Sequence, residues 1–141
     1  MRRILVVDDS MTIRALYKQM LSHMPHTSVT FATDGQQAIE IFDSVDPHIV
    51  FLDINMPRMN GLEVLKELRG RGVATPIILA TTEGQDDDLR RGREAGATDY
   101  LRKPFPLTAL RPLVERLAPI VDSVAVPVSP AVSGDVAELR R

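Results

Sequence analysis

Residues 49–53 read Ile49-Val50-Phe51-Leu52-Asp53, four consecutive apolar side chains that end at a carboxylate. A short, continuous apolar run is typical of a strand that is buried on both faces, as in a parallel sheet. Similar apolar runs recur on either side of it along the chain. They predict further strands at residues 4–7, 29–32, 77–80 and 98–101.

Amphipathic stretches separate these apolar runs, with apolar residues at helical spacing. Ser10 stands where an N-cap is expected, and Gly96 stands where a helix is expected to end. The expected helices follow Ser10 as far as Leu21, begin at Gly35, carry Leu62 to Leu68, and occupy residues 86–95 and 107–117.

Five strands that alternate with five helices predict an α/β domain built on a parallel sheet. Right-handed crossovers place helices on both faces of such a sheet, which agrees with strands that are apolar throughout. From Asp122 onward the composition changes, because Pro127 and Pro130 interrupt a stretch rich in Val, Ala and Ser. We therefore expect one domain over residues 1–120 and a C-terminal tail or linker over 121–141.

Composition excludes several classes of function. The 141 residues have a formal net charge of -2, and the 17 Lys and Arg residues are spread along the chain, which argues against direct binding of nucleic acid. The absence of cysteine excludes disulfides, thiolate catalysis and cysteine zinc sites. The apolar run 4–7 is too short for a signal peptide and no later run has membrane-spanning length, so a cytoplasmic protein without a membrane partner is expected.

Polar residues of complementary chemistry follow four of the predicted strands. Asp8 and Asp9 follow the first, Asp53 the third, Thr81 the fourth and Lys103 the fifth. In a doubly wound sheet, ligands bind beyond the carboxyl ends of the strands. Clustered carboxylates repel one another unless a cation intervenes, and Mg²⁺ prefers oxygen ligands. Together with a hydroxyl and an ammonium group they predict a phosphoryl-transfer site with an Asp nucleophile.

A plainer explanation exists for each acidic residue, because Asp after a strand is often a turn former or a helix cap. That explanation suffices for one pair of residues. It does not account for matched chemistry at four strand ends.

Four segments resemble the receiver domains of bacterial two-component response regulators. They are Leu5 to Ser10, Leu52 to Gly61, Thr81, and Lys103-Pro104-Phe105. The resemblance covers roughly residues 1–120 in order. It implies a flavodoxin-like (βα)5 fold with strand order 2-1-3-4-5. It also implies a cis peptide bond between Lys103 and Pro104.

The resemblance gives each of the acidic residues an expected role. Asp53 is the expected phosphoacceptor. The expected ligands of a Mg²⁺ cofactor are Asp8, Asp9, Asp53 and the backbone carbonyl of Asn55.

The remaining site residues also take expected roles from the resemblance. Thr81 and Lys103 contact the phosphoryl oxygens, and Tyr100 turns inward as a switch when Thr81 moves. Asn55 and Glu83 resemble the pair found in fast-cycling chemotaxis receivers, where they tune dephosphorylation.

The implied partners are a sensor histidine kinase or a histidine phosphotransfer protein. The output is a downstream protein target or a second copy of the chain, bound through the face formed by the fourth helix, fifth strand and fifth helix. Such a protein assists its own phosphorylation and dephosphorylation but is not a turnover enzyme.

Other functions are kept as alternatives. The chain is alternatively a phosphate sink, or a receiver piece of a larger response regulator or hybrid kinase. A haloacid dehalogenase-type phosphatase is disfavoured, because Ser10 stands where that enzyme needs an acid or base. A dinucleotide-binding unit lacks its glycine fingerprint after the first strand, and a receiver fold without the chemistry would lack an acceptor or a metal ligand, which are all present.

Overall fold

A five-stranded parallel sheet forms the centre of the part of the chain that the computed structural model describes, which is residues 1–56, 58–81, 86–106 and 108–119. The strand order is β2-β1-β3-β4-β5, as the resemblance implied, so the doubly wound α/β fold is confirmed. The strands are β1 (Arg2–Val7), β2 (Thr27–Ala32), β3 (Ile49–Asp53), β4 (Ile77–Thr81) and β5 (Asp99–Arg102).

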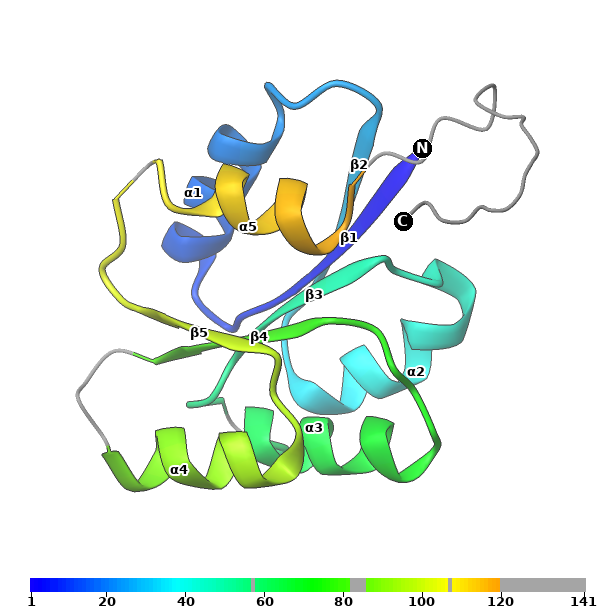
Figure 1. The fold of residues 1–141 in the computed structure, drawn as a ribbon, viewed down its shortest axis with the longest axis vertical. Coiled ribbons are helices and arrows are strands. Elements are labelled where there is room, and N and C mark those ends of the chain that lie inside the picture. The colour runs from blue at the N-terminus through cyan, green and yellow to red at the C-terminus, as the bar shows by residue number, and fades with distance from the viewer. Residues whose placement is uncertain (57, 82–85, 107, 120–141) are drawn as a thin grey trace, which may run out of the picture.

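Helices cover both faces of this sheet (Figure 1). Two of them, α1 and α5, pack on one face, and the other three pack on the opposite face. None of the helices in the described ranges is both long and apolar enough to cross a membrane. They are α1 (Met11–Leu21), α2 (Gly35–Val45), α3 (Gly61–Gly70), α4 (Asp86–Ala95) and α5 (Leu110–Leu117).

The continuous apolar runs of the central strands supply two cores at once. Because successive side chains of a strand point to opposite faces, Val50 and Leu52 of β3 pack with α2 and α3, while Ile49 and Phe51 pack with α1 and α5. All four side chains are fully buried. The edge strands β2 and β5 are only partly buried, so their runs are less uniformly apolar.

The register of the strands brings their carboxyl ends level with one another. Val7 of β1 lies opposite Leu52 of β3, so Asp8 and Asp53 leave the sheet side by side. On the next strands, Asp53 lies opposite Ala80 and Thr81 lies opposite Arg102. The residues that follow the strands therefore meet at one edge, which we call the carboxyl edge.

Polar caps fix where the helices begin. The hydroxyl of Ser10 accepts the amide N–H of Ile13, as expected for an N-cap, and Asp34 caps α2 in the same way. Asn60 and Glu63 form a reciprocal capping box at the start of α3.

The last helix begins later than expected. It was predicted from residue 107, but it begins at Leu110, and Ala109 donates its N–H to the carbonyl of Pro106 in a preceding turn. Ala109 occupies the N-cap position without a side-chain hydrogen bond, so no polar residue marks the true start. Apolar spacing alone extended the prediction through this turn.

Candidate functional site

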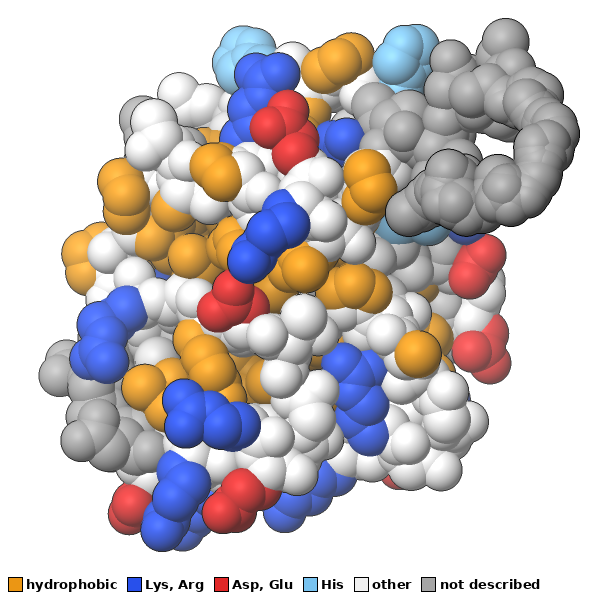
Figure 2. Space-filling view, in the orientation of Figure 1, with side chains coloured by type: hydrophobic (Ala, Val, Ile, Leu, Met, Phe, Trp, Pro, Cys, Tyr) orange, Lys and Arg blue, Asp and Glu red, His pale blue; other side chains and the backbone are white. Residues whose placement is uncertain are grey.

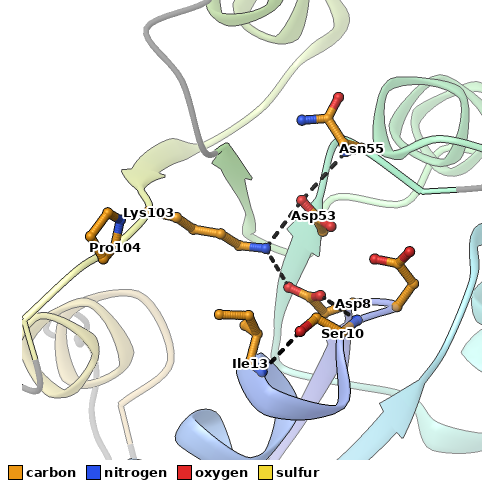
Figure 3. A pocket seen from close by; sticks show the side chains of 8 residues that line it. Asp8, Ser10, Ile13, Asp53, Asn55, Lys103 and Pro104 are labelled. Atoms are coloured by element: carbon orange, nitrogen blue, oxygen red, sulfur yellow. Dashed lines mark hydrogen bonds and ion pairs between the residues drawn. The ribbon is translucent and has the colours of Figure 1, made fainter.

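The carboxyl edge carries a buried ammonium group between two buried carboxylates. The Nζ of Lys103 lies 2.6 Å from Oδ2 of Asp8 and 3.3 Å from Oδ1 of Asp53, and all three side chains are almost completely inaccessible to solvent. Figure 3 shows the lysine reaching across from the end of β5 to the ends of β1 and β3. The Lys103–Pro104 peptide bond is cis, as the resemblance implied.

These side chains line an open pocket of about 540 Å³. Ile13 of α1 and Pro104 form apolar parts of its wall, while the side chains of Asp8, Asp53 and Lys103 point toward one another from the strand ends. The lining residues are Asp8, Asp9, Ser10, Ile13, Asp53, Asn55, Lys103 and Pro104.

The electrostatics of the pocket leave negative charge uncompensated. Burial and the nearby charge of Asp8 together raise the pKa of the Asp53 carboxyl to about 6, although Lys103 opposes both. One ammonium group thus faces two buried carboxylates, with Asp9 exposed beside them. An added cation would relieve this imbalance.

The donor set suits a hard divalent cation. Carboxylate oxygens of Asp8, Asp9 and Asp53 lie within 4.8 Å of one another. The backbone N–H of Asn55 lies 3.4 Å from Oδ1 of Asp53, so the main chain of Asn55 borders the same group. All of the available donors are oxygen atoms, which favours Mg²⁺ over softer metals. The residues present therefore fit a magnesium ion.

Thr81 and Tyr100 are not among the residues that line this pocket. Thr81 is buried at the end of β4, and its carbonyl accepts the N–H of Lys103 at 2.6 Å. The hydroxyl of Tyr100 donates to the carbonyl of Leu89 in α4 at 3.0 Å, and the guanidinium of Arg93 lies 5.8 Å from the centre of its ring. Glu83 lies outside the described residues.

Two contacts in the loops around the site were not anticipated from the sequence. Arg14 donates to the backbone carbonyl of Asp8 at 2.8 Å, which ties the β1–α1 turn to the first turn of the helix. Arg58 forms an ion pair with the N-cap carboxylate Asp34, which lies 24 residues earlier. Arg14 lies about one helical turn after the N-cap Ser10, and this spacing could have indicated the contact with Asp8. No nearby residue indicated the pair between Arg58 and Asp34.

Comparison with known proteins identifies the family. The sequence model of the response regulator receiver domain matches residues 4–115, which is most of the chain. The chain belongs to this family. As a member of a response regulator family, it is part of a two-component system.

Relatives of this receiver domain include mycobacterial regulators. Response regulator MprA of Mycobacterium tuberculosis is 41% identical over 121 residues, which are 83% of this chain and 52% of MprA. Transcriptional regulatory protein PdtaR of the same species is 37% identical over 114 residues, or 81% of this chain and 55% of PdtaR. The receiver chain therefore spans about half the length of these relatives.

Solved receiver structures share the fold. Chemotaxis protein CheY4 of Vibrio cholerae superposes with a TM-score of 0.76 at 33% identity, over 83% of this chain and 98% of CheY4. The receiver domain of NtrX from Brucella abortus gives a TM-score of 0.74 at 32% identity, over 81% of this chain and 96% of that one.

Proposed function

We propose that this receiver domain accepts a phosphoryl group on Asp53 in a Mg²⁺-dependent reaction. The observation that carries the proposal is the position of the Asp53 carboxylate. It lies in an open pocket, 3.3 Å from a buried ammonium group and within 4.8 Å of two further carboxylates. A nucleophile, a cation that suits phosphate and a set of oxygen ligands are thus within reach of one another.

The residues divide the chemistry between them. A carboxylate oxygen of Asp53 attacks the phosphorus atom, and the electron pair of the breaking bond stays on the leaving group, which takes up a proton. Lys103 and Thr81 stabilise the charge on the phosphoryl oxygens. A bound Mg²⁺ supplies further charge neutralisation at this site. The proposed ligands are Asp8, Asp9, Asp53 and the backbone carbonyl of Asn55.

The proposed donor is the phosphohistidine of a sensor histidine kinase or of a histidine phosphotransfer protein. The domain assists its own phosphorylation and dephosphorylation and turns over no outside substrate. We place this exchange in the cytoplasm, where Mg²⁺ and phosphoryl donors are both present. The proposed domain spans residues 1–120, and the tail or linker predicted over residues 121–141 lies outside the described residues.

The proposed output surface is the face formed by α4, β5 and α5. Two contacts connect these elements: Tyr100 of β5 donates to α4, and Arg116 of α5 pairs with Asp99 of β5 at 2.9 Å. Figure 2 shows Lys and Arg side chains interspersed with hydrophobic ones over this side of the molecule. If Thr81 moves toward a phosphoryl group, Tyr100 on the neighbouring strand is placed to follow it. The proposed partner is a downstream protein or a second copy of the chain, with no direct contact to nucleic acid.

Two other arrangements remain as second candidates. Relatives about twice as long favour a receiver that is one piece of a larger response regulator or hybrid kinase. A phosphate sink, which drains a kinase and binds nothing else, uses the same pocket without the output face. A pull-down with beryllofluoride-activated protein distinguishes a phosphate sink from a domain that signals through the output face. A sink gains no partner and does not change its oligomeric state on activation.

Labelling with acetyl phosphate tests the acceptor. In the presence of Mg²⁺ we expect one acid-labile phosphoryl group per chain, lost when Asp53→Ala is made or when EDTA is added. Asp43→Asn, which changes an exposed carboxylate on α2, is the matched control and should label like the unchanged chain. Labelling that survives in Asp53→Ala would refute the assignment.

The lifetime of the phosphoryl group tests the chemotaxis-like assignment of Asn55 and Glu83. We propose that these two residues tune the attack of water on the phosphoryl group, so that dephosphorylation is fast. Replacing Glu83 with Arg should change the decay rate of purified phosphoprotein. An unchanged rate would remove the reason to group this domain with fast-cycling receivers.

A further inference from the structure

The loop between β3 and α3 is fastened to the loop between β2 and α2 by an ion pair. Arg58 donates through Nη2 to Oδ2 of Asp34, which is the N-cap of α2. The carboxylate of Asp34 is almost fully buried, while the Arg58 side chain is 74% exposed. The arginine thus closes over a buried charge from the solvent side.

The backbone of Arg58 adopts a conformation that arginine rarely takes. Its φ angle is +65°, in the left-handed region that favours glycine and asparagine. A non-glycine residue is held there only when its surroundings determine the conformation. The ion pair with Asp34 is one contact that holds the Arg58 side chain in this conformation.

A second contact, between the first residue of α2 and Met59, lies next to this ion pair. Gly35 approaches the carbonyl of Met59 so closely that an added Cβ would lie 2.2 Å from that oxygen. Only a residue without a side chain permits this approach. The described residues 58 and 59 are therefore held against residues 34 and 35 by both a charge contact and a backbone contact.

The fastened loop leads directly from the acceptor. Asn55, two residues after Asp53, donates its N–H to the Asp53 carboxylate, and Gly61 donates to the carbonyl of Ile54 at 2.9 Å. An added Cβ at Gly61 would lie 2.2 Å from the carbonyl of Asp53. Through these contacts Gly61, three residues after Arg58, lies against the main chain of Asp53 and Ile54.

We propose that the Asp34–Arg58 ion pair is a positioning device for the cation site, holding the main chain at Asn55 in place beside Asp53. The inference rests on the proposed function, because it assigns these two residues to the same Mg²⁺ site. Neither residue touches the pocket, so they act through the loop and not through contact with the ion.

Asp34 stays ionised, as this role requires. The amide N–H of Gln37 lowers the pKa of its carboxyl, and the Arg58 guanidinium lowers it further. The carboxylate uses one oxygen for the helix cap and the other for the arginine. Asn at this position keeps the cap, since Asn and Asp are equally good N-caps, but removes the charge.

Three variants separate the ion pair from its surroundings. Asp34→Asn keeps the cap and breaks the charge pairing. Arg58→Gly keeps the left-handed backbone and removes the guanidinium. Arg58→Lys keeps a cation at the same place. The matched control is Glu67→Gln, which breaks the exposed Glu67–Arg71 pair on the far half of α3.

The experiment measures Mg²⁺ affinity of the full chain from the shift of the Asn55 amide signal on titration with MgCl₂. Asp34→Asn and Arg58→Gly should each weaken binding by about tenfold, within the range found when supporting residues around a metal site are lost. The double variant should be no weaker than either single one, and Arg58→Lys should recover most of the affinity. In metal-free protein, the Gly61 amide should exchange faster in both single variants.

The outcomes distinguish this inference from the proposed function. If the unchanged chain binds no Mg²⁺, the proposed function fails. If it binds Mg²⁺ and the two single variants bind equally well, the ion pair has no positioning role. If Glu67→Gln weakened Mg²⁺ binding as much as Asp34→Asn and Arg58→Gly do, the inference would also be overturned. The loss of any surface ion pair would then have the same effect.

Discussion

At the carboxyl edge of the sheet, Asp8 and Asp53 share the single ammonium group of Lys103, and all three are buried. At the opposite edge, where the strands begin, Arg3 pairs with Asp46 alone at 3.0 Å, and both are exposed. There Arg3 also donates to the carbonyl of Asp46, while its backbone N–H donates to Nδ1 of His48. The exposed Arg3–Asp46 pair at the amino edge is matched one to one, whereas the carboxyl edge is left with excess negative charge. The imbalance lies where a cation and a phosphoryl group are proposed to bind.

The largest expected difference between the two edges is the effect of the Asp53 charge on folding stability. Its pKa in the folded chain is about 6, above the ordinary value of 3.8, so the folded state binds the proton more tightly than the unfolded state does. Stability from this group is therefore complete below pH 4 and is lost as the pH rises through 6. Asp53→Asn should stabilise the metal-free protein by on the order of 3 kcal/mol at pH 7.5, from about two pKa units.

Urea unfolding in EDTA at pH 4.5 and 7.5 measures this difference. The increase in the free energy of unfolding caused by Asp53→Asn should be clearly smaller at pH 4.5 than at pH 7.5. MgCl₂ at pH 7.5 should stabilise the unchanged chain but not the variant. If Asp53→Asn raised the free energy of unfolding equally at both pH values, the excess charge would not be what destabilises the carboxyl edge.

The two ends of α3 give a second contrast between the edges. Gly61 begins the helix at the carboxyl edge, where a Cβ would lie 2.2 Å from the Asp53 carbonyl, while Gly70 ends it with nothing within 4 Å. Gly61→Ala should destabilise the fold by about 1–3 kcal/mol, because the main chain must move. Gly70→Ala should stabilise it by about 0.5–1 kcal/mol through helix propensity.

Thermal unfolding of both variants, with Mg²⁺ titration of the folded protein, measures this contrast. Gly61→Ala should also weaken Mg²⁺ binding, because the displaced main chain belongs to the acceptor. If both glycines respond alike, the packing beside Asp53 is not tighter than at the far end of the helix.

The carboxyl edge was largely predictable from the sequence because its side chains follow the strands directly. Once residues 4–7, 49–52 and 77–80 are recognised as buried strands, parallel topology brings Asp8, Asp53 and Thr81 together without further information. The amount of burial around Asp53, and so its raised pKa, depended on packing that no local pattern reports.

Contacts between loops were not predictable. The Asp34–Arg58 pair joins residues 24 apart, and its geometry exists only after α2 and α3 have packed. The start of α5 was missed for the opposite reason, since the apolar spacing extends through a turn that no capping residue marks. Sequence patterns thus located the strand ends and the carboxylates that follow them, but not the contacts that join the loops around them.

The smallest effect is expected at the amino edge, where Arg3→Met removes the pair with Asp46. Exposed ion pairs of this kind contribute about 0.2–1 kcal/mol, and salt screens them. Urea unfolding should show a loss within that range at low ionic strength, and the loss should shrink in 1 M NaCl. Phosphorylation by acetyl phosphate and Mg²⁺ affinity should match those of the unchanged chain, because the pair lies at the other end of β1 from Asp8. A change in Mg²⁺ affinity in Arg3→Met would mean that the two edges are coupled through the sheet, and that the charge imbalance is not confined to the carboxyl edge.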